Sequence, residues 1–259
     1  MRILVSNDDG VFSPGLEALV EALRPLGHIT VVAPDRERSA VGHSLTFFHP
    51  VRVHKVREDE GCVVYHTDGT PTDCVLLGIF FVMDDNRPDL VVSGINRGAN
   101  LGDDIHYSGT VSAAMEGCIH GVPSMAVSMA SFCDMQWQSG ARVARMVAEA
   151  IVANGLPRRT FLNVNVPNLP FEELAGFEAT AQGESIYQQR IVKRADPRGN
   201  DYYWITGEIP RGEPVPGTDF SAVAAGRASI TPVQLNLTQH NFLDILRGWK
   251  LMRSQPSAV

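Results

Sequence analysis

The sequence has 259 residues, of which 44% are hydrophobic and 20% are charged, and its formal net charge is −7 at pH 7. A chain of this length and composition is typical of a globular protein with a sizeable core. The acidic balance argues against a broad nucleic-acid-binding surface, so we expect no stable nucleic-acid complex.

The sequence carries no signal for export or membrane insertion. Its N-terminus lacks an apolar segment with a cleavage site, and its longest apolar run, residues 75–83, is far shorter than a membrane span. We therefore expect a cytoplasmic protein with no membrane partner. No C-x-x-C spacing indicates a zinc site or a redox pair, and buried, reduced thiols are expected at Cys62, Cys74, Cys118 and Cys133.

The first predicted unit is a strand, an acidic turn and a helix. Residues 3–5 are apolar, and two of them are β-branched, which is typical of a strand buried on both faces. Asn-Asp-Asp-Gly follows at 7–10, and the Ser-Pro pair at 13–14 favours a helix start. Asp8 and Asp9 thus lie at the carboxyl end of a strand, where open α/β sheets bind ligands. Adjacent carboxylates repel each other, so this turn is either solvated or the site of a cation.

The following segments extend the alternation of strands and helices. Residues 28–33 form a second predicted strand, followed by a polar loop at 35–44. Alternating segments at 51–57 and 62–66 indicate a hairpin. A helix is predicted from 70 to 83, and because it is apolar nearly all round we expect it to be buried.

A glycine-rich segment, 93–104, follows a third core strand predicted at 90–92. It matches neither the dinucleotide-binding G-x-G-x-x-G pattern nor a phosphate-binding P-loop. Tyr-Ser-Gly-Thr then leads into a helix with an apolar stripe over 111–119. Small hydroxyl residues at a helix start suit phosphate binding, although Ser108 or Thr110 could equally be a plain N-cap.

The rest of the chain completes the sheet and then departs from it. Strands are predicted at 123–129 and 161–166, on either side of a periodic helix at 143–151. Residues 183–218 are rich in Pro, Gly and charge and indicate a hairpin-rich arm. A short helix, a strand and a final helix are predicted at 219–227, 228–232 and 242–249.

We therefore predict a single α/β domain over 1–259. Its core, residues 1–170, is expected to be a Rossmann-like, doubly wound, mostly parallel sheet. Residues 171–259 are expected to form a hairpin-rich extension with a C-terminal β-hairpin arm and a terminal helix.

Oxygen-bearing side chains follow several of the predicted strands. Asp8, Asp9, Ser39 and Asn96 are expected at one edge of the sheet, because the carboxyl ends of parallel strands meet there. Carboxylate, hydroxyl and amide oxygens suit Mg²⁺, Mn²⁺ or Ca²⁺, whereas zinc is disfavoured because no His or Cys lies at ligand spacing. A hard cation beside a glycine-rich backbone and a hydroxylated helix start is what a phosphate ester needs.

The acidic turn, the glycine-rich segment and the hydroxylated helix start that follows it resemble the SurE survival-protein family. The members of this family are metal-dependent nucleoside monophosphate phosphatases. The resemblance implies a 5'-nucleotidase with one divalent metal ion, Mg²⁺ or Mn²⁺, and a homodimer or homotetramer built through the arm. It spans nearly the whole chain and is carried by residues 7–10, 38–39, 68–74, 93–100, 107–117, 163–167 and 218–232.

The same resemblance implies the roles of individual residues. The metal ligands would be Asp8, Asp9, Ser39 and Asn96, with Asp8, Asp9 and Asn96 also catalytic. The two loop histidines near the predicted site could protonate a leaving oxygen or could simply be solvated. The expected phosphate and substrate contacts are Ser39, Gly42, His43, His106, Ser108, Gly109 and Thr110.

Other functions are compatible with part of this pattern. A receiver-type signalling module also begins with a strand ending in paired acids, but Ser93 and Gly94 stand where its phospho-acceptor Asp would be. A non-catalytic nucleotide- or phosphate-sensing protein could use the same pocket. The nucleophile is also open between a water activated at the cation and Asp8 itself, and the lack of a second acid at i+2 favours water.

Overall fold

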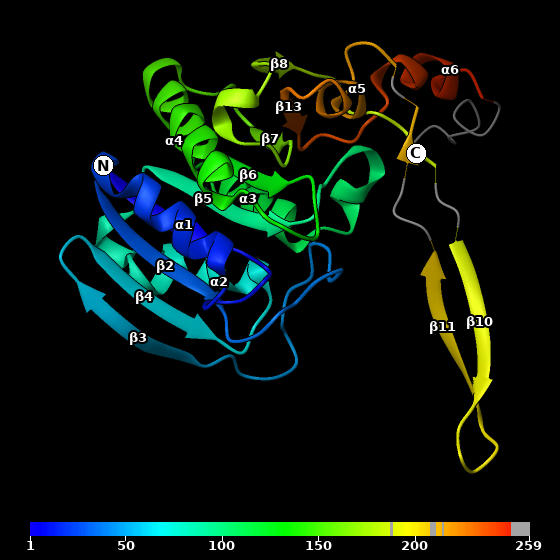
Figure 1. Ribbon diagram of the computed structural model, residues 1–259, viewed down its shortest axis with the longest axis horizontal. Coiled ribbons are helices and arrows are strands. Elements are labelled where there is room, and N and C mark those ends of the chain that lie inside the picture. Colours follow the sequence, from blue (N-terminus) through cyan, green and yellow to red (C-terminus); the bar gives the residue numbers. More distant parts are fainter. Residues whose placement is uncertain (187–188, 208–210, 214, 250–259) are drawn as a thin grey trace, which may run out of the picture.

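A nine-stranded, mostly parallel sheet forms the centre of the computed structural model, which describes residues 1–186, 189–207, 211–213 and 215–249. The strand order is β3-β4-β2-β1-β5-β6-β7-β13-β8, as Figure 1 shows. The strands of this sheet are β1 (Arg2–Ser6), β2 (His28–Pro34), β3 (Val53–Asp59), β4 (Cys62–Thr67), β5 (Leu90–Arg97), β6 (Ser124–Met129), β7 (Thr160–Val166), β8 (Phe177–Ala179) and β13 (Ala228–Gln234).

Helices cover both faces of this sheet, as the sequence predicted. One face carries α1 (Pro14–Leu23) and α4 (Trp137–Asn154), and the other carries α2 (Pro71–Leu77) and α3 (Gly109–Ile119). Ile3 and Val5 of β1 join the apolar cluster under α1 and α4, whereas Leu4 between them joins the cluster under α2. Successive side chains of a strand point to opposite faces, so an uninterrupted apolar strand is what two helical layers require.

The predicted helix over 70–83 is only partly correct. Its α-helical part, α2, ends at Leu77 and continues as a π-helical segment, Gly78–Val82. Phe80 and Phe81 in this segment are 54% and 68% exposed, so the expectation that the helix is buried all round is wrong. A helix that packs on one side of a sheet buries only the side facing it, so an apolar sequence does not make the outer side buried.

The cysteine prediction holds for three of the four thiols. Cys62, Cys74 and Cys118 are free and buried, whereas Cys133 is free but exposed. Cys133 lies in the loop between β6 and α4, where no element covers it. The expectation that every thiol is buried is therefore wrong at this position.

The C-terminal third of the chain contributes to the main sheet as well as to an arm. Since β8 and β13 pair with each other and β13 also pairs with β7, the predicted boundary at residue 170 does not coincide with an edge of the sheet. Between these strands, β10 (Gln189–Ala195) and β11 (Asp201–Gly207) form an antiparallel hairpin that projects from the body (Figure 1).

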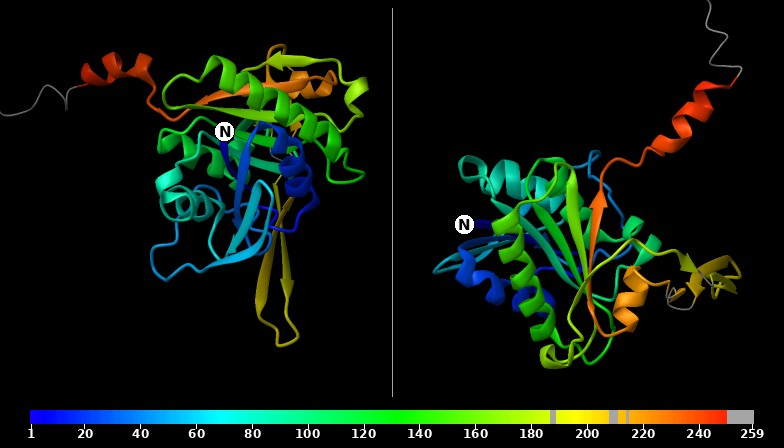
Figure 2. Two further views of the ribbon diagram at one scale, coloured as in Figure 1. Left: turned by 90° about the vertical axis from the view of Figure 1, so that its left-hand side faces the viewer. Right: turned by 90° about the horizontal axis from the view of Figure 1, so that it is seen from above.

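The remaining elements surround the base of this arm and the chain end. The strands β9 (Ser185–Ile186) and β12 (Arg211–Gly212) pair where the arm leaves the body, and α5 (Asp219–Ala224) precedes β13. The last helix, α6 (Leu243–Arg247), extends away from the sheet, as Figure 2 shows. None of the helices within the described part of the chain is long and apolar enough to cross a membrane.

Candidate active site

The acidic turn lies at the carboxyl end of β1, as the sequence predicted. Asp8 is buried and Asp9 is half-buried. Asn7, also buried, shapes this turn because its side-chain amide donates to Gly10 O at 3.0 Å and to Ser13 Oγ at 2.8 Å. The same turn therefore sets the start of α1 and the direction of the two carboxylates.

The start of α3 closes over Asp8. Thr110, which is fully buried, donates its hydroxyl to Asp8 Oδ1. A Cβ on Gly109 would lie 2.8 Å from Asp8 Cβ and 2.9 Å from Oδ2, so only glycine allows the helix to approach so closely. Ser108 is the N-cap, with its Oγ accepting from Val111 N at 3.1 Å. The hydroxyls of Ser108 and Thr110 are thus both engaged within the protein, and the helix N-terminus itself faces the acidic turn.

The loop after β2 is held across the site by contacts with several elements. Arg38 N donates to Asp8 O at 2.8 Å, and Gly42 N donates to Tyr107 O at 3.0 Å. Ser39, next to the first of these contacts, is exposed and donates its hydroxyl to Glu37 Oε1 at 2.8 Å. The structure therefore brings the Ser39 backbone to the site but turns its side chain toward Glu37.

Asn96 belongs to β5 and not to the loop that was expected to follow this strand. The register between β5 and β6 shifts between Ser93 and Asn96, and Asn96 pairs with Ser128. Its amide nitrogen donates to Gly98 O at 2.9 Å, which leaves the amide oxygen for another partner. The next residue, Arg97, donates its backbone N–H to Asp9 Oδ2 at 3.1 Å, which ties the end of β5 to the acidic turn.

Burial dominates the electrostatics of the paired acids. It raises the pKa of Asp8 from 3.8 to about 6, although donors on Thr110 lower it and the charge of Asp9 raises it further. The pKa of Asp9 is also raised, first by burial, with Arg97 N–H lowering it and the charge of Glu37 raising it. The charge of Arg97 also lowers the pKa of Asp9, but within the described residues no Lys, Arg or His forms an ion pair with either carboxylate.

The two candidate histidines occupy different places. His43 Nε2 lies 2.7 Å from Oε2 of Glu116, which is buried in α3, and His120 Nε2 lies 2.9 Å from Oε1 of the same carboxylate. Glu116 is seven residues beyond Gly109, about 10 Å along the helix at about 1.5 Å per residue, so His43 is held away from Asp8. Burial alone would raise the pKa of Glu116, but its hydrogen bonds with His43 and His120 outweigh burial and hold the pKa below its usual value.

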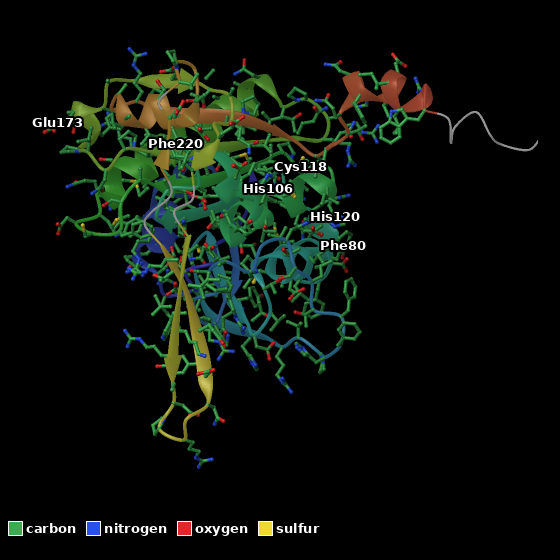
Figure 3. All side chains as sticks on the ribbon, turned by 90° about the vertical axis from the view of Figure 1, so that its right-hand side faces the viewer. Phe80, His106, Cys118, His120, Glu173 and Phe220 are labelled. Carbon is green, nitrogen blue, oxygen red and sulfur yellow. The ribbon has the colours of Figure 1, made fainter. Side chains whose placement is uncertain are left out.

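His106, unlike His43, precedes the N-terminus of α3, the end of this helix that faces the acidic turn. It is exposed at the end of the 3₁₀ segment Gly102–His106, directly before α3. Figure 3 shows it apart from His120, whose ring meets Phe80 edge-on at the other end of α3, with ring centroids 4.9 Å apart. The structure thus separates His43 from His106, which the sequence analysis treated alike.

The sequence analysis missed several residues that build this site. Asn100 holds the glycine-rich segment, since its N–H donates to Asn165 Oδ1 at 2.8 Å and its amide donates to Ser128 Oγ at 2.7 Å. Asn163 Nδ2 donates to Asn100 O at 2.8 Å. The polar Asn-x-Asn pattern within an otherwise apolar strand, residues 160–166, was the available signal.

An open α/β sheet with two adjacent acids and a helix N-terminus at its carboxyl edge is typical of the α/β proteins that bind a ligand at this edge. Comparisons with known proteins agree with this class. The family described as Survival protein SurE matches residues 3–189. The chain therefore belongs to the SurE family.

Individual relatives match over nearly their whole length. The 5'-nucleotidase SurE of Geobacter sulfurreducens is 53% identical over 259 residues, which is 100% of this chain and 97% of that protein. The 5'-nucleotidase SurE of Aquifex aeolicus is 46% identical over 253 residues, 98% of each chain. A crystal structure of the SurE protein from Aquifex aeolicus superposes with a TM-score of 0.84 at 45% identity, covering 95% of this chain and 98% of that one.

Proposed function

We propose that this protein is a 5'-nucleotidase that hydrolyses nucleoside monophosphates to nucleoside and phosphate with the help of one divalent metal ion. The observation that carries the proposal is a buried carboxylate, Asp8, next to a second one, and neither forms an ion pair with a Lys, Arg or His of the described residues. Two adjacent carboxylates without a cation are costly to desolvate, so their burial favours a metal site. The relatives named 5'-nucleotidase support the reaction, and no comparison supports the receiver-type alternative.

The donor set fits a hard cation. Asp8 and Asp9 supply carboxylate oxygens, and the amide oxygen of Asn96 is free to join them. The Ser39 hydroxyl would complete the set after turning away from Glu37. Only oxygens are offered, which favours Mg²⁺ or Mn²⁺ over zinc.

The size of the barrier also favours a metal enzyme. Phosphate monoester hydrolysis requires accelerations of up to ~10²¹-fold, whereas a helix N-terminus stabilises an anion by about 0.3–2 kcal/mol. A divalent cation, when bound, neutralises charge on the phosphate and lowers the pKa of water, which are the larger contributions.

The residues of this chain would position the phosphate. Because Gly109 has no side chain, the first turn of α3 can lie against the site, where the positive end of the helix dipole would favour an anionic phosphate. Thr110 acts through Asp8, whose Oδ1 it holds, so we assign it to positioning. His106, exposed shortly before the start of α3, would give a proton to the leaving oxygen of the nucleoside.

We propose water as the nucleophile in preference to Asp8. Asp8 is hydrogen-bonded by Thr110 and covered by Gly109, which leaves little room for a phosphoryl group on its carboxylate. Hydrolysis of a chiral phosphate tests this directly, because one in-line displacement inverts configuration and two successive ones retain it. Retention, or a phosphoenzyme lost in Asp8→Asn, would contradict the proposal.

Phosphate release from a panel of nucleotides with each divalent metal tests the function as a whole. We expect hydrolysis of nucleoside monophosphates that stops with EDTA, and no hydrolysis by Asp8→Asn or Asp9→Asn at saturating metal. Binding of nucleotides without phosphate release under every metal condition would instead identify a sensing protein.

We further propose a homo-oligomer in which a second copy covers the arm. Apolar side chains on the hairpin are left in solvent, with Ile191, Trp204 and Ile205 exposed by 69%, 61% and 80%. Isolated two-stranded hairpins are marginally stable in water, so a projecting one with exposed aromatic residues favours a partner. The oligomeric state in solution is the test.

A further inference from the structure

A hollow of about 320 Å³ opens beside Asp9, and no residue of α3 is among those that line it. It lies between the turn that leads into α1, the loop after β2, the end of β5 and the start of α4. Its size is at the lower end of the range for small-molecule sites, about 300–1,000 Å³. The residues around it are Asp9, Gly10, Val11, Phe12, Ser13, Pro14, Asp35, Arg36, Glu37, Arg97 and Trp137.

Phe12 offers an aromatic face to this hollow. Its side chain is 78% exposed, although it sits on a tight turn next to the paired acids. The turn is fixed on both sides of Phe12, because Val11 N donates to Pro34 O at 2.8 Å and Ser13 N donates to Gly10 O at 3.1 Å. The ring is therefore held in solvent on a well-ordered backbone and does not fold back into the core.

A second aromatic ring and a guanidinium group complete the walls. Trp137, the first residue of α4, packs directly on α1, since a Cβ on Gly15 would lie 2.8 Å from its Cζ3. Arg97 is exposed, and its guanidinium forms no ion pair within the described part of the chain. Two aromatic side chains and an exposed guanidinium next to the proposed phosphate site are groups of the kind that bind a nucleobase.

We infer that this hollow binds the base of the nucleoside monophosphate, with Phe12 as the stacking platform and Arg97 at the edge of the base. The inference rests on the proposed function, since it places the nucleoside on the Asp9 side of a phosphate held by α3. Stacking on a ring accepts every base, because each has an aromatic face. The site therefore fits a nucleotidase with weak preference among bases.

Binding of adenosine, a product without phosphate, tests this site independently of turnover. Calorimetry on the wild-type protein should detect the binding of adenosine. Phe12→Ala should weaken the affinity for adenosine by about tenfold, within the range seen when a stacking aromatic is removed. Phe12→Trp should restore binding. Phe81→Ala, which removes a ring that is 68% exposed and does not line the hollow, should bind adenosine like the wild type.

Kinetics supply the second measurement. For Phe12→Ala, the ratio of kcat/KM for AMP to kcat/KM for ribose 5-phosphate should fall by about tenfold, because only AMP carries a base. Wild-type affinity for adenosine in Phe12→Ala, or an altered oligomeric state with that affinity intact, would overturn the inference. A wild-type protein that binds adenosine but releases no phosphate would overturn the proposed function and leave the base site standing.

Discussion

Asp8 links the stability of the protein to pH when no metal is bound. Its pKa is raised from 3.8 to about 6 in the folded state, so folding disfavours the charged form. The resulting destabilisation is absent below the unfolded pKa, grows between the two values and is complete above about pH 6. At about 1.4 kcal/mol per pKa unit, the difference between these two pKa values corresponds to a loss of about 3 kcal/mol of unfolding free energy.

We therefore expect Asp8→Asn to stabilise the metal-free protein by up to about 3 kcal/mol at pH 8 and to have little effect at pH 3.5. Urea unfolding in EDTA at the two pH values measures this change. Asp84→Asn, at an exposed position in a 3₁₀ turn, is a suitable control and should shift the unfolding curves at the two pH values equally. An unchanged or lower stability of Asp8→Asn at pH 8 would show that burial does not destabilise the Asp8 carboxylate.

Thr110 should matter for metal binding through Asp8. Its hydroxyl donates to Asp8 Oδ1 and lowers the pKa of this carboxyl, opposing the effect of burial. In Thr110→Val the pKa should rise, so protons compete better with the metal near neutral pH. We expect a loss of Mn²⁺ affinity that is severalfold larger at pH 6 than at pH 8.5.

Ser108→Ala is the matched control for this prediction. Ser108 caps α3 by accepting from Val111 N, so its removal should cost about 1 kcal/mol of stability with no pH-dependent change in metal affinity. If Thr110→Val weakens Mn²⁺ equally at both pH values, the pKa of Asp8 is not the route by which Thr110 acts.

Among the elements, those with strong hydrophobic periodicity were predictable from sequence. Short apolar strands and the Ser13-Pro14 helix start carry their own signals, and both α1 and β1 lie where expected. Asn96 was harder to place, because β5 continues through a glycine whose φ is +137° and whose Cβ would collide with Val127 O. That close approach depends on the neighbouring strand, which local sequence does not reveal.

In the candidate site, too, local features were predictable from the sequence and contacts between distant segments were not. The sequence placed Asp8 and Asp9 correctly, since a turn after a buried strand is a local feature. It did not reveal that Thr110 donates to Asp8 or that His43 binds Glu116, because both contacts join segments far apart in the chain. Buried polar groups find partners wherever the fold brings them, so their roles follow from packing.

Asp219 is an element-scale anchor that the sequence analysis did not identify. It is fully buried at the start of α5 and accepts from Gly102 N at 2.8 Å and from Gly183 N at 2.9 Å. It thus joins the segment before α3 to the segment that leads into the arm. Asp219→Ala would leave these buried N–H groups without an acceptor, so we expect a loss of about 2–4 kcal/mol of unfolding free energy.

Hydrogen exchange should locate this loss at the two anchored segments. The Gly102 and Gly183 amides should exchange faster in Asp219→Ala than in the wild type. Asp196→Ala is the control, because Asp196 also accepts from backbone N–H groups, those of Arg198 and Asn200, but is only half-buried, at the turn of the hairpin. We expect Asp196→Ala to lower the unfolding free energy by less than about 1 kcal/mol. An equal loss in the two variants would contradict the anchoring role of Asp219.

At the scale of the whole molecule, the arm and the terminal helix extend away from the body. Figures 1 and 2 show both outside the layered core. On α6 and just after it, Ile245 and Trp249 are 60% and 47% exposed, so apolar side chains gather on both projections. Such surface is unfavourable in a monomer, because each exposed ring loses the free energy of burial that an interface would provide.

We expect the protein to be a homo-oligomer at micromolar concentration and the charge substitution Ile205→Glu on β11 to shift it toward the monomer. Ile205 is 80% exposed and pairs with Ile191 across the hairpin, so a carboxylate there would be desolvated by a covering copy. Light scattering over a dilution series gives the mass of each variant. Phe81→Glu, on an exposed ring of the body, is the control and should keep the wild-type mass. A wild-type monomer across the series would show that the projecting hairpin is stable alone, contrary to the behaviour of isolated two-stranded hairpins.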